Sequence, residues 1–223
     1  MIPFPLIGIY GGTFDPIHFG HLRVAEELVE ILRLDEVRFL PAGCPRLRNK
    51  PVASQHHRMA MLQEAIHDNG RFRLDDREIR RSGESYSVES LRELRDEFIG
   101  KKTAFCFIIG IDAFMKLSSW YLWRELFELT HFVIVNRPGH ASVVNQAILP
   151  PELKNECLGR WTHDVEMLRS TQSGHIFTAM TTLLDISATT IRACIAAKKS
   201  ARYLLPDTVL NYIGIHHVYH EEK

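Results

Sequence analysis

The sequence predicts an α/β protein with a doubly wound, mostly parallel sheet. The first observation behind this prediction is that short, strand-like apolar runs alternate with segments of helical pattern. Parallel neighbours in a sheet need a crossover connection, usually a helix, so the alternation favours a parallel sheet. The second observation is that later runs such as Ala104–Ile109 are continuously apolar, which is typical of strands covered on both faces.

Each element follows from one of these patterns. The expected strands, all short apolar runs, are Leu6–Tyr10, Val37–Leu40, Phe72–Leu74, Ala104–Ile109 and Phe132–Val135, with His175–Phe177 as a further candidate. The expected helices are His21–Leu32, Ser54–His67, Val88–Phe98 and Trp123–Leu129, one near Pro151–Cys157, one from Ser187 through Ala197, and one over Pro206–Ile213. The region Arg137–Gly174 is otherwise less regular, and the sequence leaves open whether it is a lid or an interface.

Composition narrows the class of protein. The 223 residues allow one domain, and 27 Lys and Arg balance 27 Asp and Glu, so there is no global basic field for nucleic acid. The four cysteines are scattered without a CxxC pair, which suits reduced thiols better than a disulfide framework. No apolar run approaches the roughly 20 residues that span a bilayer, and the first residues lack a basic leader segment. We therefore expect a cytoplasmic protein that binds neither membranes nor nucleic acid.

The segment Gly11–His21 is the most informative part of the chain. It connects the first expected strand to the first expected helix, with glycines at 11 and 12 that allow tight turning and close approach of a ligand. His21 falls in the first helical turn and His18 just before it, where free N–H groups and the helix dipole favour anions. The pattern favours a phosphate site over a metal pair or a solvated surface. Ligands of doubly wound sheets bind at the carboxyl ends of the strands, so Pro41–Pro51 and Gly110–Asp112 should lie at the same edge.

Two motifs in this order resemble those of a nucleotidyltransferase superfamily. Gly11–His21 resembles its GTFDPxHxGH motif, and Ile186–Arg192 resembles its C-terminal ISxTxIR motif. Within the superfamily the sequence is similar to bacterial nicotinate-nucleotide adenylyltransferases from about Leu6 to Tyr219. The resemblance implies a Rossmann-like nucleotidyltransferase fold in a single domain, 1–223, whose C-terminal helical part from about residue 186 completes the ATP site.

The implied reaction joins ATP and nicotinate mononucleotide to give deamido-NAD and pyrophosphate, in NAD biosynthesis. The implied cofactor is Mg²⁺, held mainly by ATP phosphates and water, because magnesium rarely needs a cage built entirely from protein. Alternatives are nicotinamide mononucleotide or another phosphorylated acceptor, or a nucleotide-binding regulatory module that has lost catalysis. A metal-dependent hydrolase using the two histidines lacks a third ligand at a suitable spacing. The sequence leaves open whether the protein forms a homo-oligomer.

The resemblance assigns the ATP site residue by residue. The implied catalytic residues, which stabilise charge on the reacting phosphates, are His18, His21 and Arg192. The implied ATP-binding residues are Gly12, Thr13 and Phe14 through their backbone, Gly110 and Asp112 near the adenosine, and Ser187, Thr189 and Thr190 at the β- and γ-phosphates. The competing interpretation of Asp112 and Ser187 is simple helix capping.

The acceptor site is assigned in the same way. The resemblance implies that Trp120 stacks on the pyridine ring, that Tyr86 and Ser87 receive the nicotinate carboxylate, and that Arg48 contacts phosphate. A core tryptophan and a helix cap are the competing interpretations. Two positions depart from the family pattern: Leu47 replaces the usual histidine, and Ala42 stands where asparagine is common.

The remaining polar residues receive structural interpretations. We expect Asp15 to order the turn rather than act as a base, Trp123 to lie in the core, and Arg58 to be structural. His56 is expected at the surface. The histidine-rich segment His216–His220 is interpreted as an exposed polar end rather than a metal site, because no carboxylate or cysteine has a matching spacing.

Overall fold

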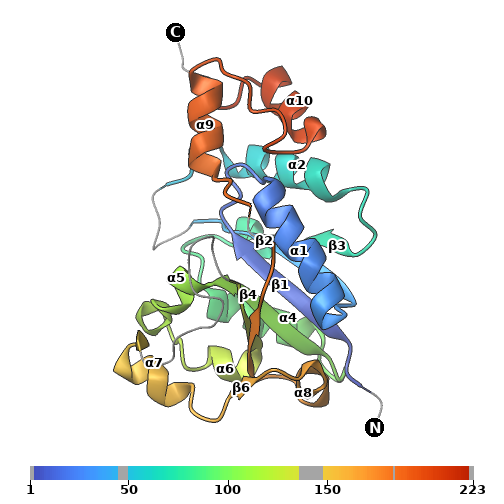
Figure 1. Cartoon of the computed structure of the whole chain (residues 1–223), viewed down its shortest axis with the longest axis vertical. Coiled ribbons are helices and arrows are strands. Elements are labelled where there is room, and N and C mark those ends of the chain that lie inside the picture. The colour runs from blue at the N-terminus through green and yellow to red at the C-terminus, as the bar shows by residue number, and fades with distance from the viewer. Residues whose placement is uncertain (1–2, 45–49, 136–147, 183, 221–223) are drawn as a thin grey trace.

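The computed structural model describes residues 3–44, 50–135, 148–182 and 184–220 (Figure 1). These residues form a seven-stranded sheet with the order β3-β2-β1-β4-β5-β7-β6, and all of its strand pairs are parallel. The strands are β1 Leu6–Gly12, β2 Glu36–Pro41, β3 Phe72–Leu74, β4 Ala104–Gly110, β5 His131–Val135, β6 Trp161–Thr162 and β7 Ile176–Ala179. The predicted fold class, a doubly wound parallel α/β sheet, is confirmed.

The strand order reverses between β1 and β4. From β1 the chain builds outward through β2 to β3, and then returns to place β4 on the other side of β1. The register pairs Gly12 with Pro41 and Tyr10 with Ile108, so β1, β2 and β4 end at the same edge. Such a reversal opens a crevice at the carboxyl ends of the strands, where ligands of doubly wound sheets bind.

Helices cover both faces of the sheet (Figure 1). They are α1 Phe19–Leu32, α2 Gln55–Ile66, α3 Arg77–Arg80, α4 Ser87–Glu97, α5 Ile111–Phe114, α6 Leu126–Leu129, α7 Pro151–Glu156, α8 Val165–Ser170, α9 Ala188–Ala196 and α10 Asp207–Ile215, with a 3₁₀ turn at Leu117–Ser119. The side chains of α1, α2, α8, α9 and α10 join one hydrophobic core, and those of α4, α5, α6 and α7 join another. None of these helices, in the part of the chain that is described, is long and apolar enough to cross a membrane.

The two cores explain why β4 is continuously apolar. Cys106 and Ile108 belong to the core beneath α1, whereas Phe105, Phe107 and Ile109 belong to the core on the opposite face. Alternate side chains of a strand point to opposite faces, so a strand between two cores needs an apolar residue at every position. The sequence-based interpretation of this run is therefore confirmed.

Most predicted strands and helices match the structure to within about two residues. The prediction for Trp123–Leu129 was wrong in length, because only Leu126–Leu129 is helical and the preceding residues form turns after Leu122, whose φ is 50°. The elements not predicted are α3, α5, α8 and β6, which span two to six residues each. The region expected to be less regular contains α7, β6 and α8 within residues 148–174. Elements this short show no clear periodicity, and they form because they pack on the sheet.

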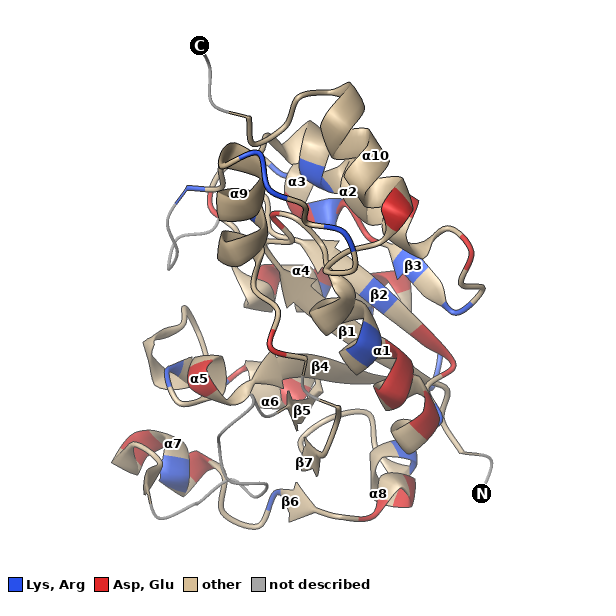
Figure 2. Ribbon diagram, turned by 45° about the horizontal axis from the view of Figure 1, so that its top comes forward, with Lys and Arg blue, Asp and Glu red and all other residues tan. Residues whose placement is uncertain are grey.

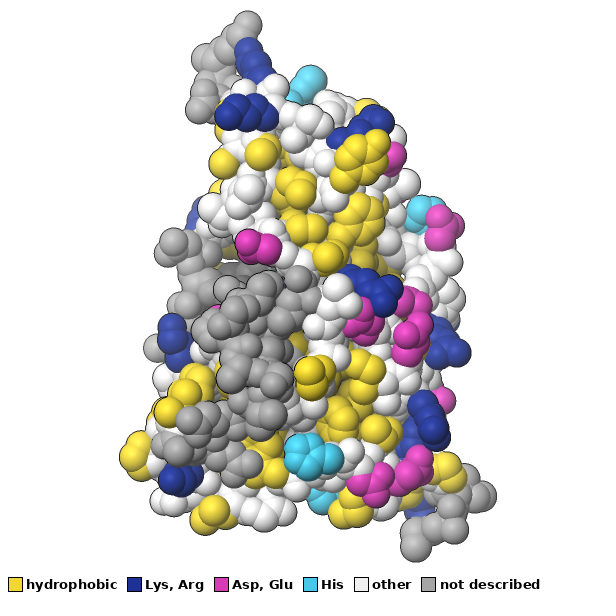
Figure 3. Space-filling model, in the orientation of Figure 1, with side chains coloured by type: hydrophobic (Ala, Val, Ile, Leu, Met, Phe, Trp, Pro, Cys, Tyr) yellow, Lys and Arg dark blue, Asp and Glu magenta, His cyan; other side chains and the backbone are white. Residues whose placement is uncertain are grey.

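The surface carries both signs of charge side by side. Figure 2 shows basic and acidic residues on the same elements, including α1, α7 and α8. On the face seen in Figure 3, apolar side chains gather over the region of α9 and α10, and charges of both signs lie beside them. This mixture agrees with a formal net charge of zero. Anion recognition must therefore come from local donors rather than from a protein-wide field.

Candidate active site

His18 and His21 lie together at the start of α1. His18 is the N-cap residue, with extended backbone at φ −151° and ψ 170°. The two imidazole rings stack with centroids 3.8 Å apart and an angle of 28° between their planes. His21 lies in the first turn of α1, which is 14 residues long, so the helix dipole favours an anion at this end.

The buried His18 ring has an unused nitrogen. The side chain is only 6% exposed, and burial lowers its pKa to about 4, so the ring is neutral at pH 7. Among the described residues its Nδ1 atom has no hydrogen-bond partner. Buried polar atoms are nearly always paired, so this nitrogen calls for a partner such as a water, an ion or a ligand. The most informative segment of the sequence thus contains a buried atom that no described residue pairs.

Two glycines allow the close packing of this turn. A Cβ atom on Gly12 would lie 2.8 Å from the ring of Phe14, and one on Gly20 would lie 3.0 Å from the His18 ring. The same Cβ on Gly20 would lie 3.6 Å from the carbonyl oxygen of Ile186. A side chain on Gly12 would therefore collide with the buried Phe14 ring, and one on Gly20 would crowd the His18 ring and contact the second motif.

Phe14 has a strained backbone that its own ring stabilises. Its φ is 48°, in the left-handed region that costs a side-chain-bearing residue roughly 1–2 kcal/mol. The ring is 2% exposed and packs against Tyr10, His21 and Phe39, with centroids 5.9, 5.1 and 5.7 Å away. The loop backbone is held by side-chain packing beneath it, in a conformation that an unpacked loop would leave.

The second motif begins α9 and lies against the first. Ser187 is the N-cap of α9, and its Oγ accepts a hydrogen bond from the N–H of Thr190 at 3.1 Å. Arg192 donates to the carbonyl oxygen of Asp15 at 2.7 Å and to Oγ1 of Thr189 at 3.3 Å. Ser187 therefore caps α9, as its structural interpretation requires. The contact of Arg192 with Asp15 brings together the two motifs that were predicted to share a site.

Asp15 connects three segments that are distant in sequence. Its carboxylate accepts the N–H groups of Val52 at 2.7 Å and Ala53 at 3.1 Å, directly before α2. It also accepts the Tyr219 hydroxyl at 2.7 Å. Burial and the neighbouring carboxylate raise the pKa of Tyr219, which keeps this hydroxyl protonated as a donor. These contacts are what the expected turn-ordering role of Asp15 requires.

The C-terminal segment was only partly described by the prediction of an exposed polar end. His216, His217 and His220 are exposed, but Val218 and Tyr219 are buried, at 7% and 9% exposure. The histidine-rich composition drew attention away from Tyr219, whose hydroxyl donates to Asp15 near the other end of the chain. Sequence reasoning missed Tyr219, and the only available signal was an aromatic residue next to an apolar one inside the polar run.

Two of the predicted acceptor residues, Tyr86 and Ser87, lie near the end of β2. Tyr86 is the N-cap of α4 and Ser87 its first residue, and the Tyr86 ring lies 4.7 Å from that of Tyr121. Just before them, Ser85 Oγ accepts the N–H groups of Gly43 and Cys44, each at 3.1 Å. These two hydrogen bonds hold the start of α4 near the carboxyl end of β2.

The two tryptophans of this region, Trp120 and Trp123, differ in burial. Trp123 is 6% exposed and in the core, as predicted. Trp120 is half-buried, and its ring meets Phe107 edge-on with centroids 6.1 Å apart. Arg48, the predicted phosphate contact, lies outside the described residues, and so does Leu47, which replaces the usual family histidine.

Ala42 stands where asparagine is common in the family, and its carbonyl oxygen accepts a hydrogen bond from Arg58.

Gly110 lies at the carboxyl end of β4 and caps α5. Its φ is −71°, and a Cβ atom there would have nothing within 4 Å. Neither the backbone conformation nor packing against the described residues requires glycine at this position. Asp112 is exposed in the first turn of α5, so Gly110, not Asp112, is the cap.

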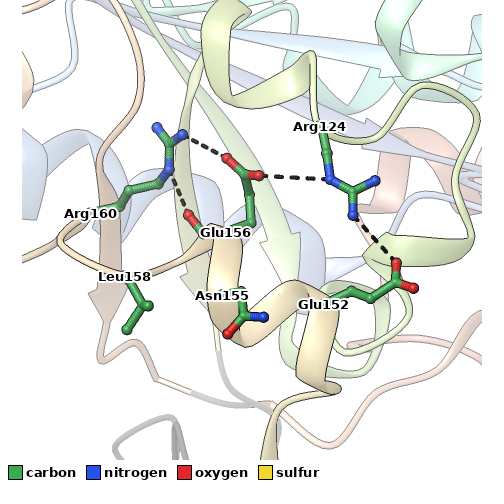
Figure 4. A pocket seen from close by; sticks show the side chains of 6 residues that line it. All are labelled: Arg124, Glu152, Asn155, Glu156, Leu158 and Arg160. Carbon is green, nitrogen blue, oxygen red and sulfur yellow. Dashed lines mark hydrogen bonds and ion pairs between the residues drawn. The ribbon is translucent and has the colours of Figure 1, made fainter.

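Elsewhere the surface has a polar hollow of about 560 Å³, lined by Arg124, Glu152, Asn155, Glu156, Leu158 and Arg160 (Figure 4). Arg124 pairs with Glu152 at 3.5 Å and with Glu156 at 3.9 Å, and Arg160 pairs with Glu156 at 2.6 Å. Its cations are thus already neutralised. Arg160 also donates to the carbonyl of Gly174, which precedes β7, so the Arg160 side of the hollow lies toward the amino edge of the sheet.

A metal centre made by the chain itself finds no support at the motif edge. Within the described ranges, no group of three or more His, Cys, Asp or Glu side chains is arranged to hold a metal ion. His18 and His21 therefore have no third ligand of this kind there, which a zinc hydrolase would need. All four cysteines, Cys44, Cys106, Cys157 and Cys194, are free thiols.

Comparison with known proteins agrees with both motifs. A family model described as cytidylyltransferase-like matches residues 9–194. A probable nicotinate-nucleotide adenylyltransferase of Dechloromonas aromatica is 43% identical over 213 residues, covering 96% of this chain and 97% of that protein. One of Pseudomonas aeruginosa is 40% identical, covering 96% of each.

Solved structures agree with the fold. The Plasmodium falciparum nicotinic acid mononucleotide adenylyltransferase complexed with NaAD has a TM-score of 0.70 at 20% identity, covering 96% of this chain and 97% of that one. The same protein complexed with APC has a TM-score of 0.69 at 18% identity, with the same coverage. From the family match and the near full-length relatives, this chain belongs to the nicotinate-nucleotide adenylyltransferase family of the cytidylyltransferase-like proteins.

Proposed function

We propose that this enzyme joins ATP and nicotinate mononucleotide to give nicotinate adenine dinucleotide and pyrophosphate, a step in NAD biosynthesis. A phosphate oxygen of the mononucleotide attacks the α-phosphorus of ATP, and the bond from that phosphorus to the oxygen bridging it to the β-phosphorus breaks. Pyrophosphate leaves with the electron pair. The observation that supports this proposal is the meeting of the two motifs, in which Arg192 donates to the carbonyl oxygen of Asp15 and Gly20 lies against Ile186, in the same segment as the stacked His18 and His21 rings.

The proposed catalysis is positioning and charge stabilisation without a covalent enzyme intermediate. Negative charge develops on the leaving pyrophosphate, so donors held in place before the reaction stabilise it most effectively. In this proposal the His18 and His21 imidazoles contact the reacting phosphates. Arg192, the Ser187, Thr189 and Thr190 hydroxyls and the N-terminus of the nine-residue α9 hold the β- and γ-phosphates.

The two substrates are proposed to lie on either side of this point. The backbone of Gly12, Thr13 and Phe14 would contact ATP, and the segment of Gly110 and Asp112 would contact its adenosine. In support, a Cβ atom on Gly110 would have no described atom within 4 Å. On the other side, Trp120 would stack on the pyridine ring, and Arg48 would contact phosphate. Tyr86 and Ser87 would receive the carboxylate at the N-terminus of the 11-residue α4.

Nucleotidyltransferases use a divalent metal, and we propose that it is Mg²⁺ here. Most groups at the motif edge are imidazoles, a guanidinium, hydroxyls and N–H groups, which suit phosphate oxygens, and the Asp15 carboxylate is already bonded to Val52, Ala53 and Tyr219. Magnesium prefers oxygen ligands. In the described chain no cluster of three metal-ligating side chains competes for it. The ion would be bound by phosphate oxygens and water, and it would neutralise charge on the triphosphate.

Release of pyrophosphate from ATP, measured with a panel of acceptors, tests the proposal. We expect turnover with nicotinate mononucleotide, at least about tenfold higher kcat/KM than with nicotinamide mononucleotide, and none with phosphopantetheine or without acceptor. The carboxylate gains charge-assisted hydrogen bonds of around 1.5–3 kcal/mol that the amide lacks. Release without an acceptor would indicate a hydrolase, and ATP binding without turnover would indicate a regulatory module.

Three further expectations belong to this proposal. They are a single domain over 1–223 with the C-terminal helical part from about residue 186 completing the ATP site, a cytoplasmic location, and no nucleic-acid or membrane partner. The contact of Arg192 with Asp15 supports the first of these.

A further inference from the structure

Arg58 joins the two loops that border the crevice. It lies on α2 and is 0% exposed, the largest side chain among the fully buried ones in the described residues. Its Nη1 donates to the carbonyl oxygen of Thr13 at 2.8 Å, and its Nη2 donates to those of Ala42 at 2.7 Å and Gly43 at 3.4 Å. Thr13 follows β1 and Ala42 follows β2, so one guanidinium holds both strand exits at a set distance.

Burial of this arginine is unfavourable by itself. Desolvation lowers the pKa of Arg58, and nearby Asp15, Tyr219 and Glu78 counteract it only in part. Among the described residues, the guanidinium donates to three backbone carbonyls, and Nε has no partner. Burying a charge for neutral acceptors costs stability. What arginine offers in return is geometry, because its planar fork aims donors in fixed directions at both loops, whereas the ammonium of a lysine is a compact charge on a flexible stem.

The contact with Thr13 sets the direction of the next N–H group. In a planar trans peptide the C=O and the following N–H point in opposite directions. With the Thr13 carbonyl turned toward Arg58, the Phe14 N–H must point away from α2. The strained φ of 48° and the buried ring fix the same peptide from its other end. The direction of the Phe14 N–H is therefore determined on both sides.

We propose that Arg58 is a positioning residue for ATP. It holds the peptide between Thr13 and Phe14 so that the N–H faces the nucleotide, and it keeps this donor at a constant distance from the β2 exit beside the acceptor. Naming ATP as the ligand rests on the proposed function. A role in the stability of the fold alone is the competing interpretation.

Arg95 provides a matched control. It also holds three carbonyl oxygens, those of Thr103, Leu129 and Gln172, at 2.8, 2.5 and 2.7 Å. Burial lowers its pKa to about 10. These carbonyls precede β4, β5 and β7, at the edge opposite to the motifs. Arg58→Lys and Arg95→Lys therefore remove the same kind of fork from opposite ends of the sheet.

ATP is titrated calorimetrically into each variant with Mg²⁺ and without acceptor. Both variants should melt at lower temperature than the wild type. Arg58→Lys should raise the Kd for ATP at least about tenfold and lower kcat by about 10²-fold, because misplacement by 1 Å has effects of that size. Arg95→Lys should leave both within about twofold, since distant sites act independently.

Unchanged ATP affinity in folded Arg58→Lys, or equal losses in both variants, would overturn the proposal. Arg58→Gln, which avoids burying an ammonium group, is the second variant and should show the same loss of ATP affinity. Failure of both Arg58 variants to fold would assign the residue to folding and also overturn it. A wild type that binds ATP without using nicotinate mononucleotide would refute the proposed function, while the titration would still decide the role of Arg58.

Discussion

The two edges of the sheet hold their buried histidines in different ways. At the amino edge, His131 is 0% exposed and stacks on His175, with ring centroids 5.4 Å apart. Its Nε2 donates to the carbonyl of Thr171 at 3.1 Å, and its Nδ1 accepts the N–H of His175 at 3.0 Å. At the carboxyl edge, the Nδ1 of His18 has no partner among the described residues. Burial lowers the pKa of both rings to about 4.

The comparison separates two uses of the same side chain. Both rings are neutral at pH 7, so protonation state does not distinguish them. What differs is whether the chain itself satisfies both ring nitrogens. At the amino edge, described residues pair both nitrogens of His131, with a carbonyl oxygen and an N–H group, whereas no described residue pairs Nδ1 of His18. Since burial shifts both pKa values alike, hydrogen bonding and not the pKa distinguishes the two rings.

The largest expected effect is at His21. If it stabilises charge on the reacting phosphates, His21→Ala should lower kcat by about 10²–10³, as loss of one preorganised donor typically does. Steady-state pyrophosphate release measures this, and thermal melting checks that the fold is kept. His175→Ala, at the opposite edge, should leave kcat unchanged. Comparable losses of rate in both variants would erase the functional difference between the edges.

The next largest effect is expected at Arg192. A guanidinium binds phosphate oxygens with two parallel hydrogen bonds, whereas an ammonium offers a point charge. Arg192→Lys should raise KM for ATP by about tenfold and Arg192→Ala by about 10²-fold, from hydrogen bonds to charged groups of about 1.5–3 kcal/mol. Initial rates over a range of ATP concentrations give both values. If neither variant changes KM or kcat, Arg192 serves only to hold Asp15.

Tyr219 tests whether the C-terminal segment stabilises the carboxyl edge. Tyr219→Phe removes the hydroxyl bond to the buried Asp15 carboxylate and should destabilise the fold by about 1.5–3 kcal/mol. The control is Tyr212→Phe, whose hydroxyl lies 3.0 Å from Nδ1 of His57 near the surface, and the expected effect is below about 0.5 kcal/mol. Urea unfolding of both variants measures the difference. Equal effects would mean that the Asp15 contact contributes no more than a surface hydrogen bond.

The smallest effect concerns acid. His18 and His131 titrate near 6.5 when unfolded and near 4 when folded, so the unfolded chain binds more protons between these values. The free energy of unfolding should therefore fall as the pH drops from 6.5 toward 4. His131→Gln keeps a donor for Thr171 and should reduce this slope by up to about 1.4 kcal/mol per pH unit. Urea unfolding at several pH values checks it, and an unchanged slope would contradict the assignment of His131 as a buried neutral ring.

Sequence patterns were sufficient for the parallel sheet and for the turn before α1. Continuous apolar runs such as β4 follow from burial on both faces, so they can be recognised without knowing what covers them. The pair His18 and His21 lies within a local turn, where short spacing already places both rings at one helix end. Local rules therefore predicted the centre of the candidate site and the edge on which it lies.

Tertiary structure alone decided which residues hold that site in place. Tyr219 reaches Asp15 across 204 positions, and Arg58 reaches Thr13 across 45. Arg58 and Arg95 bind backbone carbonyls, which every residue carries, so no sequence pattern marks their partners. The physical reason is that helix and strand periodicity arises from neighbours along the chain, whereas these hydrogen bonds form only after the sheet has brought distant backbone groups to one edge.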